Sequence, residues 1–276
     1  MRGDGLARVV ANSIPKSGTH LLDRLLVLLG FEQVEGGIRP NLVEGRFRPV
    51  RRLLRGRGEK VTVGVVSPRE ISRRWLAGRL SRVPEGGFIN AHCVYTPELA
   101  ELFREEGMRM VCILRDPRDV AVSQMHYIKQ REQHFAHEGY MALPSDRERL
   151  LVSIQGGELD GREIEPLGER YGQFLKWGRE GGAEMVRFED LVGPLGGGSE
   201  EAQRLAVERV ATHLGIPVDE RTMRSVKEGL FGVGRTFRRG QVGGWREEFT
   251  AEHERALGDS VGPLLAELGY EADPSR

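Results

Sequence analysis

The stretch VVANSIPKSGTHLL, residues 9–22, decides the fold of this chain. Its apolar start predicts a short buried strand, and paired leucines from Leu21 to Leu29 predict a helix that ends before Gly30. The turn between them holds Lys16 and Gly18. In such a turn backbone N–H groups converge on an anion, the helix dipole favours negative charge, and a lysine adds a full positive charge. The stretch therefore predicts a phosphate site between a strand and a helix.

This turn is not a Walker A loop, because its lysine comes before its only glycine. The alternative is an ordinary strand-to-helix turn with a lysine on the surface. A nucleotide-binding kinase or hydrolase of the P-loop kind stays open as a second class of enzyme.

A second apolar run, Met108–Leu114, predicts a parallel strand that is buried on both faces. Pro117 then suits the first position of a helix, with Asp116 as its cap. Arg115 would lie at the carboxyl end of a central strand, where open α/β sheets bind ligands. The alternative is a helix start that carries only a surface ion pair.

A third segment, Arg235–Thr250, contains adjacent arginines, Arg238 and Arg239, with several glycines and the aromatic residues Trp245 and Phe249. This composition predicts a basic loop that could fold over an anion, with guanidinium forks and a close approach of the backbone.

In this order the three segments resemble the PAPS-dependent sulfotransferases, PAPS being 3'-phosphoadenosine 5'-phosphosulfate, from about Val9 to Thr250. Pro15–Thr19 is similar to the family's 5'-phosphosulfate loop, and Arg115–Ser123 to its 3'-phosphate motif. Arg238–Trp245 is similar to its late cofactor loop, and Arg187–Leu191 to its Tyr-Glu-Asp segment. The resemblance implies a P-loop-like sulfotransferase fold, a parallel sheet flanked by helices, and transfer of a sulfuryl group from PAPS to an acceptor hydroxyl, with PAP as product.

The resemblance also implies a set of cofactor-binding residues: Lys16, Ser17, Gly18, Thr19, His20, Arg115, Ser123, Arg238, Arg239 and Gly240. Lys16 would neutralise charge on the oxygen that bridges to the leaving 5'-phosphate. Ser123 would hold Lys16 back until the acceptor is bound. Arg115 and Ser123, with the late arginines Arg238 and Arg239, would hold the 3'-phosphate.

A strand over Phe88–Ala91 ends at His92. A single histidine at a strand end is more often structural, but its position between the first loop and Arg115 matches the family's general base. A neutral imidazole suits the removal of a proton from a hydroxyl. The resemblance therefore implies His92, Lys16 and Ser123 as catalytic residues, direct in-line transfer, and no metal.

Several positions depart from the family pattern. Leu21 stands where an aromatic residue stacks on adenine, so this stacking is either weaker or comes from elsewhere, with Met223 and Phe231 as candidates. Asn90 stands where a lysine is usual, and Phe188 where a tyrosine is usual. Late in the chain the short dimerisation motif is matched only in part, which leaves a homodimer open. The acceptor class, whether small molecule, lipid or glycan, also stays open.

Composition limits the number of domains and the classes of function that the sequence allows. The chain has 276 residues, 39% of them apolar, which predicts a single α/β domain over residues 1–276. Lys plus Arg and Asp plus Glu both number 41, which argues against a nucleic-acid binder. The cluster Arg46–Lys60, inside a variable segment over about 31–87, is either a solvated basic insertion or a surface for an acidic acceptor or a membrane. A non-catalytic anion-binding module is the corresponding non-enzyme alternative.

Two cysteines, no long apolar span and no signal-peptide pattern predict a cytoplasmic protein without a transmembrane segment. The polar region over about 130–165 predicts a mobile loop on the acceptor side, where His126, His134 and His137 line a pocket rather than bind a metal. Glu189 and Asp190 are predicted to have structural roles, or to orient basic residues, rather than to form a catalytic acid pair.

Along the sequence the predicted strands and helices alternate, which indicates a parallel sheet. The predicted strands are 8–13, 88–91, 108–114 and 184–188, and the predicted helices are 19–29, 97–106, 117–129, 167–180, 200–214, 219–228 and 251–268.

Overall fold

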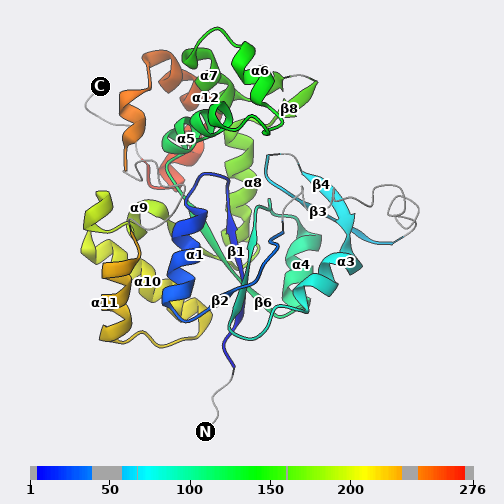
Figure 1. Cartoon of the computed structure of the whole chain (residues 1–276), viewed down its shortest axis with the longest axis vertical. Coiled ribbons are helices and arrows are strands. Elements are labelled where there is room, and N and C mark those ends of the chain that lie inside the picture. The colour runs from blue at the N-terminus through cyan, green and yellow to red at the C-terminus, as the bar shows by residue number, and fades with distance from the viewer. Residues whose placement is uncertain (1–4, 39–57, 67, 160, 232–241, 271–276) are drawn as a thin grey trace.

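Five parallel strands form the central sheet, in the order β2-β5-β1-β6-β9 (Figure 1). The computed structural model describes residues 5–38, 58–66, 68–159, 161–231 and 242–270. The bounds of the sheet strands are β1 Arg8–Ser13, β2 Glu32–Gln33, β5 Gly87–Ala91, β6 Met108–Leu114 and β9 Glu184–Arg187. Two antiparallel hairpins stand outside the sheet, β3 Lys60–Val63 with β4 Arg69–Ser72 and β7 Gly157–Leu159 with β8 Arg162–Ile164.

Alternation along the strands divides the interior into two apolar layers. Val9 and Ala11 of β1 belong to one layer, while Val10 between them belongs to the other. In β6, Val111 and Met110 likewise fall on opposite faces. Because successive side chains of a strand point to opposite faces, both layers need helices to cover them.

The helices cover both faces of the sheet and the carboxyl ends of its strands (Figure 1). One layer is covered by α1 Thr19–Leu28, α9 Phe188–Leu191, α10 Glu200–Leu214 and α11 Glu220–Gly229. The other layer is covered by α3 Arg73–Leu80, α4 Pro97–Glu105 and α8 Leu167–Arg179. Beyond the strand ends lie α5 Pro117–Gln130, α6 His137–Ala142, α7 Asp146–Gln155 and α12 Ala251–Glu267, with short 3-10 turns at Pro194–Gly196 and Gly244–Glu247.

The predicted fold class is confirmed, and so are the predicted strands and helices of the framework. β1, β6 and α10 have the predicted bounds, and the other predicted elements differ by one residue at one or both ends. Local signals explain this agreement. Asp116 accepts a hydrogen bond from the Arg118 N–H at the start of α5, and Pro117 takes the first helical position.

The segment predicted as a loop over 130–165 instead contains α6, α7 and the β7–β8 hairpin. The polar composition of this segment obscured the apolar residues that form one narrow face of α7. Leu150 and Ile154 of α7 lie one turn apart and are both buried, and Ser145 caps the helix. Such a stripe becomes stable only when other helices cover it, so tertiary packing decided this region.

The variable segment also has regular structure in its described part. The strands β2, β3 and β4 and the helix α3 all fall between residues 31 and 87. Most of the predicted basic cluster, residues 46–57, lies outside the described residues.

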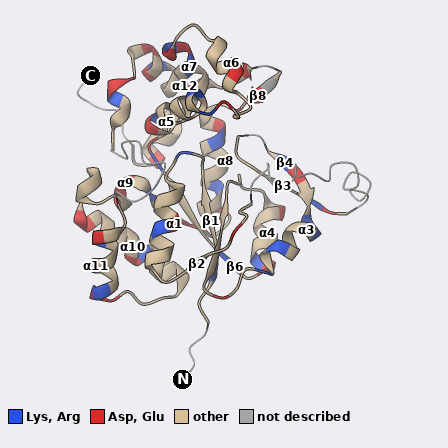
Figure 2. Cartoon of the chain, viewed as in Figure 1, with Lys and Arg blue, Asp and Glu red and all other residues tan. Residues whose placement is uncertain are grey.

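Charges of both signs lie side by side on the outer helices (Figure 2). On α10, Arg204 pairs with Glu201 and Glu208, and Lys227 of α11 reaches Glu200 at 2.8 Å. Exposed pairs of this kind contribute little to stability. Among the described residues, no helix has both the length and the apolar character needed to cross a membrane.

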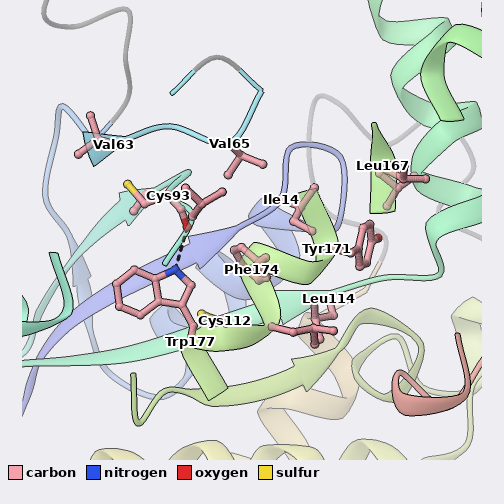
Figure 3. Close-up of a cluster of buried hydrophobic side chains, with 14 of the residues drawn as sticks. Ile14, Val63, Val65, Cys93, Cys112, Leu114, Leu167, Tyr171, Phe174 and Trp177 are labelled. Atoms are coloured by element: carbon pink, nitrogen blue, oxygen red, sulfur yellow. Dashed lines mark hydrogen bonds between the residues drawn. The ribbon is translucent and has the colours of Figure 1, made fainter. Parts of the chain in front are cut away.

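One buried cluster connects α8 to the chain segment that follows β5 (Figure 3). The indole N–H of Trp177 donates to the Cys93 carbonyl at 2.9 Å, inside a cluster that also includes Ile14 and Phe174. A hydrogen bond inside the core fixes the position of the backbone at Cys93, the residue after His92.

Candidate functional site

Three adjacent parallel strands bring the predicted residues to one edge of the sheet. His92 follows β5, the loop 14–18 follows β1, and Arg115 follows β6. Because these strands are neighbours with the same direction, their carboxyl ends meet at the same edge, where open α/β sheets bind ligands.

The loop after β1 has an unusual backbone. Lys16 has a φ of 77° and Gly18 a φ of 111°, both in the left-handed region. A Cβ at Gly18 would lie 2.7 Å from the Phe188 ring and 3.0 Å from the Ile113 Cδ1. Position 18 therefore needs glycine for space as well as for conformation. The strained conformation of Lys16 is of the kind that clusters at functional sites.

Ser17 shapes this loop from inside. Its side chain is fully buried, and its hydroxyl proton is shared between the carbonyls of Ile14 at 2.7 Å and Ile113 at 3.0 Å. Its backbone N–H donates to Ile14 at 3.1 Å. Ser17 thus closes the turn and fastens it to β6, while Gly18, Thr19 and His20 begin the helix.

Helix α1 begins without a side-chain cap. Other described helices have a Ser, Thr or Asp cap that accepts a backbone N–H, among them Ser72, Thr96, Asp116, Ser145, Ser199 and Asp219. The first-turn N–H groups of α1, at the positive end of the helix dipole, therefore suit an anionic ligand. The His20 side chain in this turn is 65% exposed, with Nδ1 3.7 Å from Asp23 Oδ2.

Arg115 lies against two groups at the end of β6. Its guanidinium carbon is 4.4 Å from the centre of the Phe188 ring, and its Nη2 is 3.6 Å from Asp119 Oδ2. The backbone carbonyl of Arg115 accepts the Tyr171 hydroxyl at 2.6 Å. Phe188, where the family pattern has a tyrosine, thus gives the guanidinium a flat surface that keeps it extended.

Asp119 connects the second predicted segment to the third. Its carboxylate accepts the N–H groups of Gly243 at 3.0 Å and Trp245 at 2.9 Å. Burial raises the pKa of Asp119, while the Arg115 guanidinium and these N–H groups oppose that rise. Arg118 adds a contact between the same segments, since its guanidinium lies 4.2 Å from the Trp245 ring centre. The predicted ligands Arg238, Arg239 and Gly240 lie outside the described residues.

Lys16 extends toward α5. Its Nζ lies 4.5 Å from the centre of the Tyr127 ring, a cation–π contact. Ser123 is one helical turn before Tyr127 on the same helix and is half-buried. The structure thus brings Lys16 to the helix that carries Ser123, and the retention of Lys16 by the Ser123 hydroxyl stays a prediction.

His92 is half-buried and bonded through one ring nitrogen to β1. Its Nδ1 lies 2.8 Å from the Ser13 carbonyl oxygen and 3.1 Å from the Ser13 Oγ. A carbonyl oxygen can only accept, so Nδ1 is the donor, and in the neutral form of the ring this places the lone pair on Nε2. This is the tautomer that a base acting through Nε2 requires.

Sequence reasoning missed Asn12, which fixes the backbone beside His92. Its side-chain amide donates to the Cys93 carbonyl and accepts the Cys93 N–H, both at 3.0 Å. Asn12 is fully buried. The available signal was a polar residue inside an otherwise apolar strand, since a buried amide needs bonded partners.

The positions that depart from the family pattern have definite surroundings. The Asn90 amide donates to Asp23 Oδ2 at 2.9 Å, so this neutral buried side chain is bonded to α1. Leu21, Met223 and Phe231 all pack at the edge of the same apolar layer. Which of them contacts adenine stays a prediction.

Three histidines near α5 have separate protein partners. His126 Nε2 lies 2.7 Å from a Glu248 carboxylate oxygen, and His137 Nδ1 lies 2.9 Å from the Ile128 carbonyl. The ring of His134 stacks on Phe135, and burial lowers its pKa. Within the described part of the chain, no three His, Cys, Asp or Glu side chains form a group that could hold a metal ion.

Glu189 stands at the start of α9 rather than at a strand end. Its carboxylate accepts the Asp116 N–H at 2.9 Å and the Tyr270 hydroxyl at 2.5 Å. Burial raises the pKa of Glu189. These bonds give it a structural role, in which it fixes the backbone next to Arg115.

The fold and this edge together define an α/β protein with basic side chains and an uncapped helix start at the strand ends. The family of sulfotransferase domains matches residues 7–151, more than half of the chain, and the chain belongs to this family. Sulfuryl transfer is therefore its general activity. No curated protein matches the chain.

Solved structures share the fold at low sequence identity. Mouse sulfotransferase SULT7A1, complexed with PAP, superposes with a TM-score of 0.62 at 16% identity, covering 96% of this chain and 89% of that one. Retinol dehydratase with androsterone and the inactive cofactor PAP gives 0.53 at 17% identity, covering 98% and 83%. Retinol dehydratase with retinol and PAP gives 0.55 at 18% identity, covering 94% and 81%.

Proposed function

We propose that this protein transfers the sulfuryl group of PAPS to an acceptor hydroxyl, with His92 as the general base. The observation that carries the proposal is the bond from His92 Nδ1 to the Ser13 carbonyl. Ser13 ends β1 just before the Lys16 loop, so the base and the anion loop meet at one residue.

The donor fits the groups at the strand ends. The uncapped first turn of α1 and the Lys16 ammonium suit the 5'-phosphosulfate. Arg115, held in place by Phe188 and Asp119, suits the 3'-phosphate, because a guanidinium fork matches phosphate oxygens. The PAP bound in the structural relatives supports the same nucleotide here.

Direct transfer then follows from these positions. The acceptor oxygen forms a bond to sulfur, the bond from sulfur to the bridging 5'-phosphate oxygen breaks, and the hydroxyl proton passes to His92 Nε2. The electron pair of the broken bond stays on the leaving phosphate, where Lys16 offsets the added charge. By analogy with phosphoryl transfer, positioning and charge stabilisation lower the barrier.

The acceptor side favours a hydroxyl on an apolar or aromatic body. Tyr127, His134 and Phe135 form a partly buried aromatic cluster, with Tyr127 directly against Lys16. Aromatic walls of this kind bind flat apolar molecules. Androsterone and retinol, which retinol dehydratase binds, have this character.

Calorimetry with PAP, ATP and AMP tests the donor site. We expect PAP to bind tightest, and Arg115→Ala to weaken PAP binding by about 1.5–3 kcal/mol, the usual worth of a hydrogen bond to a charged group. Arg104→Ala, an exposed arginine on α4, is the matched control and should leave PAP binding unchanged. Equal or tighter binding of ATP would indicate a kinase or hydrolase instead.

A transfer screen with labelled PAPS against an acceptor library tests the reaction itself. We expect label in at least one hydroxyl compound, and none when Lys16 is replaced. Retention on heparin or liposomes that survives replacement of Lys16 and Arg115, without transfer to any acceptor, would indicate a non-catalytic binding module.

A further inference from the structure

Ser13 lies between His92, the proposed base, and the loop that is proposed to bind the sulfuryl donor. Its side chain is fully buried, and its Oγ lies 2.7 Å from Thr19 Oγ1 and 3.1 Å from His92 Nδ1. We propose that Ser13 couples the sulfuryl-donor loop to the base through the hydrogen-bond chain His92–Ser13–Thr19. This inference rests on the proposed function and adds a positioning residue to it.

The chemistry of the three side chains fixes the donor-to-acceptor direction of the hydrogen-bond chain His92–Ser13–Thr19. His92 Nδ1 must carry a proton, because it bonds to the Ser13 carbonyl at 2.8 Å. The Ser13 Oγ therefore accepts at Nδ1, and its own proton is left for Thr19 Oγ1. The Thr19 proton in turn is left for a ligand at the first turn of α1. Every donor in this hydrogen-bond chain thus points from His92 toward the 5'-phosphate of the nucleotide.

This direction gives the chain a role in the reaction. When His92 Nε2 takes the acceptor proton, the ring becomes cationic and Nδ1–H becomes a stronger donor. That change polarises the Ser13 and Thr19 hydroxyls toward the 5'-phosphate, which gains negative charge as its bond to sulfur breaks. Hydrogen bonds in series strengthen one another in a buried setting. The chain thus links uptake of the proton to departure of the phosphate.

Neighbouring contacts allow the hydroxyl to be tested apart from the fold. In Ser13→Ala the backbone carbonyl that sets the His92 tautomer remains. Asn12 still holds Cys93 through two hydrogen bonds, and Trp177 through one. The substitution therefore removes the link to Thr19 and leaves the position of His92 intact.

Steady-state kinetics with PAPS and an acceptor from the screen give the first test. We expect kcat of Ser13→Ala to fall about tenfold, equivalent to about 1.4 kcal/mol, with PAP affinity changed less than about threefold. Ser13→Thr, which keeps the hydroxyl, should restore most of kcat. Thr19→Val should lower kcat. Adding Ser13→Ala to Thr19→Val should lower kcat little further, because both substitutions break the same hydrogen-bond chain.

NMR of the PAP complex gives a second test that needs no acceptor. PAP should shift the His92 Nδ1–H resonance in the wild type and in Ser13→Thr, and this shift should be at least halved in Ser13→Ala. Wild-type kcat and an unchanged PAP shift in Ser13→Ala would overturn the coupling, as would full additivity of the two losses. A wild-type protein that does not bind PAP at all would instead refute the proposed function.

Discussion

The strand-tip region and the helical cap are built in opposite ways. We define the strand-tip region as Ser13–Thr19, Asn90–Cys93 and Arg115–Asp119, and the helical cap as α6, α7 and α12 together with Gln124 of α5 and Arg170 of α8. In the strand-tip region, side chains bond to the backbone of the same or the neighbouring strand, as Ser17 does to Ile113 and His92 to Ser13.

The helical cap is held by side chains that join separate helices. Arg170 of α8 is fully buried and donates to Gln124 of α5 at 2.6 Å and to the Ser153 carbonyl of α7 at 3.0 Å. His253 of α12 bonds to the Arg147 carbonyl of α7 at 3.0 Å. The pairing of neighbouring strands thus sets the contacts of the strand-tip region, whereas packing between helices sets those of the cap. We infer that chemistry depends on the first region and stability on the second.

The largest effect expected in the strand-tip region comes from His92→Ala. Under the proposed mechanism, loss of the general base should lower kcat by about 10²–10⁴-fold, while PAP affinity stays nearly unchanged, because the base acts on the acceptor hydroxyl. His213→Gln is the matched control, since His213 lies at the opposite end of the sheet beside Arg109 of β6. Full activity of His92→Ala, or turnover abolished by EDTA, would contradict the mechanism.

In the helical cap, Gln124→Leu should act on stability rather than on the donor site. It leaves the buried Arg170 without its side-chain acceptor, and burial already lowers the pKa of Arg170 to about 10. We expect the free energy of unfolding to fall by about 1–3 kcal/mol, the cost of an unsatisfied buried donor. Denaturant unfolding measures this loss, and PAP affinity should change less than about threefold.

A double variant sharpens this result. Replacement of a buried charged group together with its partner by apolar residues is often neutral or stabilising. Gln124→Leu with Arg170→Met should therefore be more stable than Gln124→Leu alone. A double variant that is less stable would show that Arg170 contributes through its charge, and the cap would then depend on specific polar bonds as the strand-tip region does.

The separation of contacting residues along the sequence explains how far the structure could be predicted. The turn at Lys16, the cap Asp116 and the strand ending at His92 were all predicted, because each depends on residues close in sequence. The helices α6 and α7 were missed, since the stripe of Leu150 and Ile154 becomes stable only against other helices. The hydrogen bonds from Asn12 and Trp177 to Cys93 were missed because these residues are far apart in the sequence.

The smallest effect is expected where the two regions meet. Glu189 bonds to the Asp116 N–H of the strand-tip region and to the hydroxyl of Tyr270, which follows α12 of the cap. The substitution Glu189→Gln replaces the carboxyl group with a neutral amide of nearly the same shape. The new side chain can keep both contacts, because its carbonyl oxygen accepts the N–H and its amide donates to the phenol oxygen.

The pH dependence of this change has a definite sign. Burial raises the pKa of Glu189 above its ordinary value, so the carboxyl favours the folded state while protonated. That contribution is present below the unfolded pKa and is lost as the pH rises through the folded value. Glu189→Gln should match the wild type in acid and exceed it at neutral pH, by up to about 2–4 °C in Tm, or about 1 kcal/mol. Thermal unfolding from pH 4.5 to pH 7.5, with the exposed Glu180→Gln as control, measures the difference. A variant that loses stability relative to the wild type as the pH rises would mean that the ionised carboxylate holds the two regions together.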